Sequence, residues 1–102
     1  MAEVKLSDLR ILRTSKFAGK EIHFIDQISV DKILQTGYGT GSKYSPRGRF
    51  IVLDSGCIEA IDNSDGCAFM EGFRTVRAAK RWLTDEDFDY EAYCKRAKRR
   101  RA

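Results

Sequence analysis

The segment GYGTGSKYSPRGR, residues 37–49, gathers glycine, tyrosine and basic residues in a way that invites comparison with a phosphate-binding loop. Such a loop has the pattern G-x-x-x-x-G-K-[ST] and leads from a strand into a helix, so that backbone N–H groups face the phosphates. Here Ser42 separates Gly41 from Lys43, and the segment is expected to follow a helix and precede a strand. Both the spacing and the order therefore argue against nucleotide hydrolysis.

Contact with a nucleic acid is a better chemical interpretation of the same segment. Tyr38 and Tyr44 could stack on bases. Lys43, Arg47 and Arg49 could neutralise phosphates. The alternative is a solvated connection whose tyrosines rest on the core. We predict that the segment is mobile in the free protein and becomes ordered on contact with a partner.

Two further groups of basic residues are candidates for partner binding. The first is an arginine row at a predicted helix: Arg74, Arg77 and Arg81. The second is the C-terminal run KRAKRRR, which contributes Lys95, Arg96, Lys98 and Arg99. An arginine row is also common on any exposed helix face, and the run suits an acidic protein as well as a nucleic acid.

The charges are separated along the chain. The net charge is +4, and the run at residues 95–101 carries six positive charges, so the preceding residues sum to about −2. All charged residues from 32 to 49 and from 74 to 81 are basic, whereas all charged residues from 54 to 71 and from 85 to 91 are acidic. This separation predicts distinct electrostatic faces rather than a uniformly positive surface.

Groups that could catalyse a reaction or bind a metal are sparse. The three cysteines and the single histidine are widely spaced, without a CxxC pair: Cys57, Cys67, Cys94 and His23. They indicate neither a disulfide framework nor a zinc ribbon. Asp62 and Asp65 resemble the opening of a calcium loop, but the rest of that pattern is missing, which favours a hairpin turn. We therefore expect no enzymatic activity, no cofactor and no metal.

Residues 49–73 carry the clearest structural signal. Three runs rich in β-branched and aromatic residues are separated by Ser55-Gly56 and by residues 63–66, both suited to tight turns. This predicts a three-stranded antiparallel meander with one face covered and the other partly exposed to water.

Helices are predicted on both sides of the meander. Residues 75–83 follow a Thr75 cap, residues 88–99 have acids at their start and bases at their end, and residues 29–37 run from a Ser29 cap to Gly37. Residues 21–26 are expected to be extended. Residues 8–20 fit either a helix before that strand or a hairpin turning at residues 18–20.

The fold class is therefore α+β, with the C-terminal helices packed on one face of the meander and an uncertain N-terminal α/β segment. We expect a single domain at residues 1–94 and a basic tail at 95–102. No apolar run reaches the roughly 18 residues of a membrane span, and the first residues lack a secretory layout, so we expect a cytoplasmic protein. Free sheet edges leave both a monomer and a small homo-oligomer open.

The strings IEAIDNSDGCAFMEGF, residues 58–73, and AAKRWL, residues 78–83, resemble a pattern of small accessory proteins of bacteriophages and mobile elements. The resemblance covers about a third of the chain and implies a ββα module without an active site. It implies stoichiometric binding to a host protein or ribonucleoprotein, as in anti-CRISPR inhibitors of bacterial defence complexes. The alternative is a small nucleic-acid-binding protein or phage regulator that uses the basic segment, the arginine row and the tail.

Overall fold

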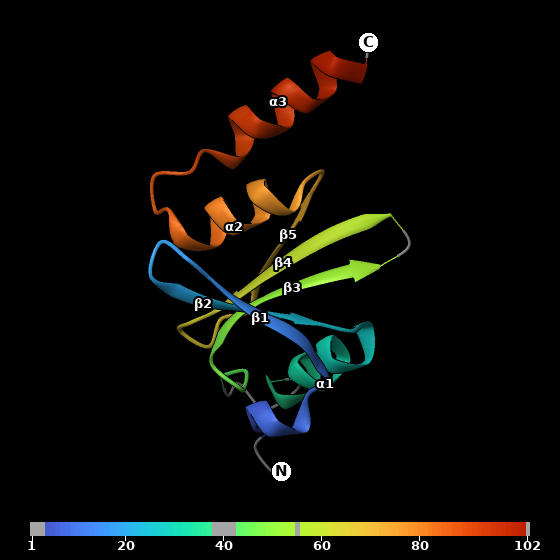
Figure 1. Cartoon of the computed structure of the whole chain (residues 1–102), viewed down its shortest axis with the longest axis vertical. Helices are drawn as coiled ribbons and strands as arrows, with labels where there is room; N and C mark the ends of the chain where they lie inside the picture. Colours follow the sequence, from blue (N-terminus) through green and yellow to red (C-terminus); the bar gives the residue numbers. More distant parts are fainter. Residues whose placement is uncertain (1–3, 38–42, 55, 102) are drawn as a thin grey trace.

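The structure is a computed structural model that describes residues 4–37, 43–54 and 56–101, without the side chains of residues 37, 54 and 96–101. Its centre is a five-stranded sheet in the order β1-β2-β3-β4-β5 (Figure 1). The strands are β1 (Ile11–Phe17), β2 (Lys20–Ile25), β3 (Gly48–Asp54), β4 (Cys57–Asn63) and β5 (Phe69–Phe73). The helices are the 3₁₀ turn η1 (Leu6–Asp8), α1 (Gln27–Gly37), α2 (Val76–Thr84) and α3 (Tyr90–Arg101).

The predicted meander is present as β3, β4 and β5, but it is only part of the sheet. β1 and β2 add an antiparallel hairpin, and β2 pairs with β3 in parallel. The hairpin turns at Ala18 and Gly19, whose φ angles of 52° and 78° give the left-handed pair that matches the twist of the strands. Of the two alternatives for the N-terminal region, the hairpin is therefore correct.

Helix α1 connects the two parallel strands β2 and β3, and it begins two residues before the predicted start. Asp26 caps it, because the Ser29 N–H donates to Asp26 Oδ1 at 2.9 Å. Hydrogen bonds from Ser29, through its side chain and its N–H, lower the pKa of Asp26. The predicted Ser29 cap is wrong because the Ser29 hydroxyl accepts the Arg10 N–H at 2.8 Å and so ties the entry of β1 to α1.

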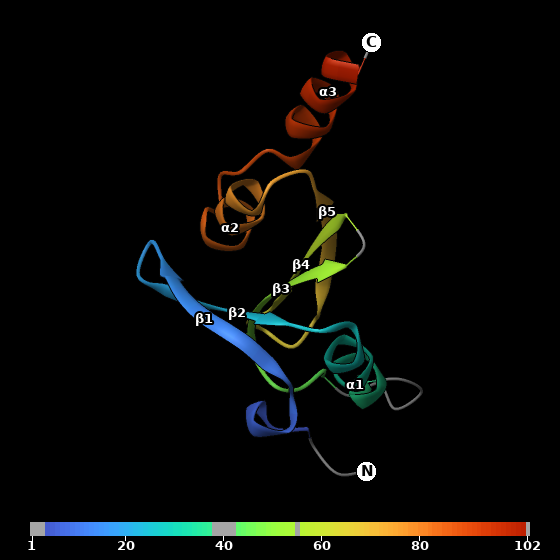
Figure 2. The ribbon, with the colours of Figure 1, turned by 45° about the vertical axis from the view of Figure 1, so that its right-hand side comes forward.

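Helices lie on both faces of the sheet at β3, while exposed positions at Cys57 and Gly72 fit the predicted partly wet face of the meander. Figure 2 shows α1 on one side of the sheet and α2 on the other. Neighbouring residues of β3 point to opposite faces. Phe50 and Val52 join a cluster with α1 residues, and Ile51 joins one with α2 residues. A strand buried on both sides has a continuous apolar sequence, as Phe50 to Val52 do.

The C-terminal helices pack on the same face, as predicted. The Thr75 cap is confirmed, since its hydroxyl accepts the Ala78 N–H at 3.1 Å. The start of α3 is attached through rings that surround Phe73, with Tyr90 and Tyr93 at centroid distances of 5.4 and 5.5 Å. α3 includes the basic run at 95–101, and none of the described helices is long and apolar enough to cross a membrane.

Candidate functional site

The described part of the basic segment, from Lys43 onward, is attached to the turn between β4 and β5. Asn63 is fully buried, and its amide group donates to Pro46 O at 2.7 Å and to Tyr44 O at 3.2 Å. The same side chain accepts the Ala68 N–H at 3.1 Å. These hydrogen bonds satisfy backbone groups of the segment and of the β4–β5 turn. The predicted mobility of residues 37–49 falls in part on residues 38–42, which lie outside the described residues, and it stays a prediction.

The two predicted base-stacking tyrosines do not form a described platform. The half-buried Tyr44 packs against the cluster between the sheet and α1, which is the alternative considered for it. Its N–H also donates to Gly66 O at 2.9 Å. Tyr38 lies outside the described residues. Tyr44 is therefore a core residue of this loop rather than an exposed stacking surface.

Lys43 and Arg47 are exposed and lie together at the β4–β5 turn, and we name them the turn pair. A Cβ atom on Gly66, which has a φ of 88°, would stand 2.7 Å from Lys43 Cβ and 2.9 Å from Arg47 Cζ. This close approach shows that both side chains lie against Gly66. Lys43 Nζ also reaches Cys67 Sγ at 3.6 Å.

Arg49 does not belong with the turn pair, although the sequence suggested one group. Its Nε donates to Leu83 O at 2.9 Å, where the guanidinium complements the negative end of α2. It also lines an open cleft of about 150 Å³, together with Lys20, Asp62, Ser64, Trp82, Leu83, Thr84, Asp85 and Glu86. This cleft contains both charge signs, and Arg49 has a structural role in it.

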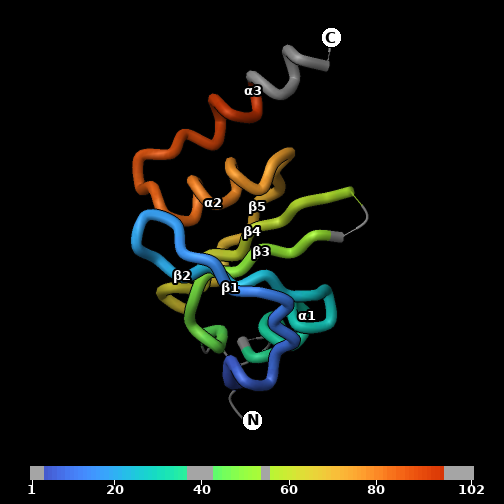
Figure 3. Tube along the Cα trace, in the orientation of Figure 1, coloured from blue at the N-terminus to red at the C-terminus, as the bar shows by residue number. Residues whose placement is uncertain are grey.

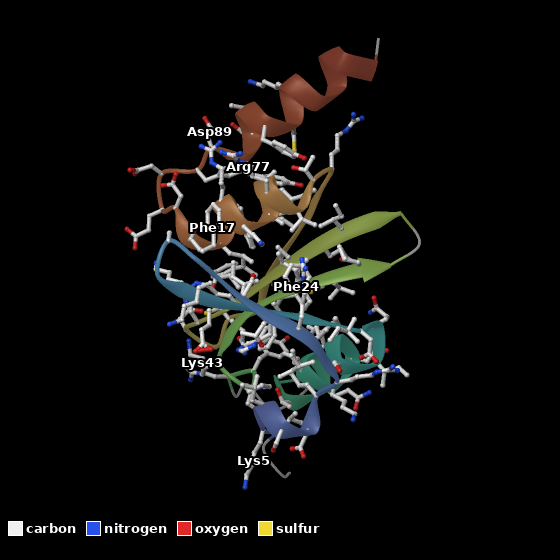
Figure 4. The ribbon with its side chains drawn as sticks, viewed as in Figure 1. Lys5, Phe17, Phe24, Lys43, Arg77 and Asp89 are labelled. Carbon is white, nitrogen blue, oxygen red and sulfur yellow. The ribbon has the colours of Figure 1, made fainter. Side chains whose placement is uncertain are left out.

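The predicted arginine row is separate from the turn pair: Figure 4 shows Arg77 in the upper half of the view and Lys43 in the lower half, with the sheet between them. Arg74, Arg77 and Arg81 are exposed. The guanidinium of Arg81 lies over the Phe88 ring, 5.6 Å from its centroid. Opposite this exposed side, α2 buries Ala79 and Leu83 against the sheet. This burial fixes the α2 backbone that carries Arg77 and Arg81.

The predicted tail residues continue α3. Lys95 is exposed, and Arg96, Lys98 and Arg99 occupy helical positions whose side chains lie outside the description. The candidate residues thus divide into the turn pair, the structural Arg49, and a helical group. We name Arg74, Arg77, Arg81 and Lys95 the helical surface.

Arg13 is a cationic residue that sequence reasoning missed. Its guanidinium lies 4.2 Å from the centroid of the Phe24 ring, and Lys80 Nζ lies 5.7 Å from the same centroid. Both cations therefore meet one buried ring between β1 and α2. Only the β1–β2 hairpin register, which places Arg13 opposite Phe24, could have revealed this contact.

The histidine and the aspartates of the β4–β5 turn have structural partners. His23 is buried, and its Nδ1 lies 2.8 Å from Thr14 Oγ1. Asp62 accepts the Ser64 N–H and hydroxyl, and Asp65 accepts the Cys67 N–H, which lowers the pKa of Asp65. These are turn contacts, as predicted. Within the described residues, no three His, Cys, Asp or Glu side chains are grouped to hold a metal ion.

No protein-family model, curated protein sequence or solved structure matches the chain.

Proposed function

We propose that this chain is a non-enzymatic protein of a phage or mobile element that acts by stoichiometric binding to a host macromolecule. The resemblance at residues 58–83 supports a bacterial defence complex as the target. The binding element is the helical surface. The observation that carries the proposal is that its arginines are exposed on a helix whose opposite side is buried in the core.

A rigid support favours binding, because side chains that are already positioned lose less conformational freedom when a partner arrives. The positioning comes from two sides. α2 is held by the burial of Ala79 and Leu83, and the Arg74 N–H donates to the Tyr93 hydroxyl at 2.6 Å. The start of α3 and the start of α2 are therefore linked.

The proposal is tested by capture from a bacterial lysate that contains a defence complex, followed by mass spectrometry and measurement of the mass of the purified complex. We expect one host protein or ribonucleoprotein at a fixed ratio. Arg77→Ala with Arg81→Ala should abolish capture, because both arginines would contact the partner. Lys43→Ala with Arg47→Ala is the matched control, which removes the same charge from the turn pair and should retain capture.

Capture of no specific partner, alongside tight binding to free nucleic acid, would contradict this function. It would support a second candidate, a nucleic-acid-binding protein. The observation that favours this candidate is that α3 continues through the basic run, which brings six positive charges onto one helix, with Lys95 of the helical surface among them.

Binding to single-stranded and duplex oligonucleotides over a range of salt concentrations measures this second candidate. Replacement of Lys95, Arg96, Lys98 and Arg99 by alanine should lower the slope of log affinity against log salt by about 0.7–0.9 per lost phosphate contact. Lys43→Ala with Arg47→Ala should change that slope less. Equal changes for both variants would show that α3 has no special role.

A further inference from the structure

The outer edge of the sheet at β1 carries backbone groups available for pairing. Among the described strands, β1 pairs only with β2. Phe17 and Lys20 flank the two-residue turn, so their backbone N–H and C=O groups form a hydrogen-bonded pair. Hydrogen-bonded and non-bonded pairs alternate along an antiparallel ladder. The N–H and C=O groups of Thr14 and Lys16 therefore point away from β2.

The side chains along this edge are basic. Residues 9–20 contain four basic residues and no acidic one. Arg13 lies on the α2 face, where the Phe24 ring holds its guanidinium at 4.2 Å. Lys16 lies on the other face, since successive residues of a strand alternate. An extended segment laid along β1 would meet a cation on each face.

The length of this edge is limited at both ends. A register shift between Ile11 and Arg13 interrupts the ladder at Leu12, whose side chain is 57% exposed. The turn at Ala18 and Gly19 ends the strand on the other side. A regular run of five residues, Arg13–Phe17, remains between them. This run can accept a strand of about the usual length.

A second copy of the chain is a poor occupant for this edge. Antiparallel pairing of β1 with itself would place basic side chains opposite or diagonal to one another, and like charges across a strand pair are destabilising. Basic residues on an edge strand prevent self-association for this reason. A segment that carries acidic side chains has the complementary charge.

We propose that β1 accepts an extended acidic segment of a protein partner as an added strand of the sheet. The inference rests on the proposed function, because the segment would belong to the host protein that the chain binds. Main-chain hydrogen bonds to Thr14 and Lys16 provide the affinity, and Arg13 and Lys16 select for acid. This contact lies on the strand edge and is separate from the helical surface.

The test uses the full chain labelled with ¹⁵N and an acetylated heptapeptide in which pairs of glutamates alternate with pairs of threonines, so that each face of the added strand carries acid. We expect the amides of Thr14 and Lys16 to exchange with solvent at least about tenfold more slowly when the peptide is in excess, because each gains a hydrogen bond. Cross-strand contacts between the peptide and β1 should appear in the same spectra. A peptide with lysine in place of glutamate is the control for charge.

Two variants separate strand pairing from simple charge attraction. Lys16→Pro removes an outward N–H and should abolish the protection of Thr14 by the peptide. Arg13→Glu with Lys16→Glu keeps the backbone and should bind the lysine peptide in preference to the glutamate peptide. Lys5→Glu changes an exposed charge away from β1 and should leave binding unchanged.

Undiminished peptide binding by both variants would overturn the inference. So would the absence of protection at Thr14 and Lys16 with millimolar peptide. If lysate capture persists in that case, the proposed function stands without strand addition. If capture fails while the peptide pairs with β1, the proposed function fails and the strand-accepting edge remains.

Discussion

The two outer strands of the sheet differ in how their edges are treated. At β5, two tyrosines from α3 bind the backbone: the Tyr90 hydroxyl donates to Gly72 O at 2.9 Å, and the Tyr93 hydroxyl accepts the Arg74 N–H at 2.6 Å. At β1, the edge has basic side chains and a register shift. Figure 3 shows β1 along the outside of the sheet and the start of α3 near α2.

The contrast between the β5 edge and the β1 edge indicates that α3 has two separate roles. Its first turns cover one sheet edge with side-chain hydrogen bonds, and covering an edge prevents unwanted strand pairing. Its later residues carry the basic run. The β1 edge carries basic side chains, which repel another copy but attract an acidic strand. One edge is therefore covered and the other is open to an acidic strand, and the predictions below test this contrast.

The largest expected effect comes from Phe73→Ala, which removes the ring at the centre of the contacts that attach α3. Loss of a buried phenylalanine costs about 3–5 kcal/mol in the free energy of unfolding. Urea denaturation measures this cost, and hydrogen exchange should show faster exchange at Arg74. The exposed Leu12→Ala on β1 should change stability by less than about 0.5 kcal/mol. Equal costs for the two variants would contradict the contrast.

Proline substitutions compare the bonded and the open side of β1. Ser15→Pro should cost about 1–3 kcal/mol more than Lys16→Pro, because only the Ser15 N–H points into the ladder with β2. Thermal unfolding of both variants measures the difference. A larger cost for Lys16→Pro would show that the backbone groups of Ser15, and not those of Lys16, point away from β2. That result would remove the basis of the strand-addition proposal.

Tyr93→Phe tests the covered edge with a single hydroxyl. The loss of one hydrogen bond to the Arg74 N–H should cost about 1 kcal/mol, since the exposed amide can bind water instead. The ring contact with Phe73 stays, so exchange at Arg74 should rise without release of α3. Unchanged exchange at Arg74 would mean that the tyrosine hydroxyl does not cover this edge.

The smallest expected effect is the contribution of Tyr90 ionisation to stability, which appears only at alkaline pH. Burial first, then the neighbouring Cys94 and Glu71, raise the pKa of Tyr90 above its ordinary value of 10.0. A raised pKa in the folded state means that stability is fully present below pH 10 and is lost as the pH rises further, because the unfolded chain releases its proton first. Denaturation above pH 10 should show a shallower loss for Tyr90→Phe than for the unchanged chain. Identical slopes would contradict this origin.

Much of the fold could be predicted because its signals are local. The turn residues between Phe50 and Phe73 predicted three strands, and the Thr75 cap with its apolar spacing predicted α2. The Ser29 cap was wrong because a hydroxyl that can cap a helix can equally bind another segment, and here it binds the Arg10 N–H. Local pattern does not distinguish the two uses.

The candidate binding residues were predicted less well, because neighbours in sequence were treated as neighbours in space. Arg47 and Arg49 are two residues apart, yet the Arg47 side chain lies against Gly66, whereas Arg49 donates a hydrogen bond to Leu83 O at the end of α2. Arg13 had no signal of its own, since its contact with Phe24 exists only after the hairpin forms.

The sequence by itself determined the α+β class, the meander, the positions of the helices and the separation of charge. These follow from periodicity, turn residues and composition, which act over a few residues. Only the tertiary structure decided that β2 pairs in parallel with β3, that helices lie on both faces of β3, and that one edge is closed by α3 while the other stays open. These features depend on contacts between segments far apart in the chain, which form where the whole sheet offers surface to bury.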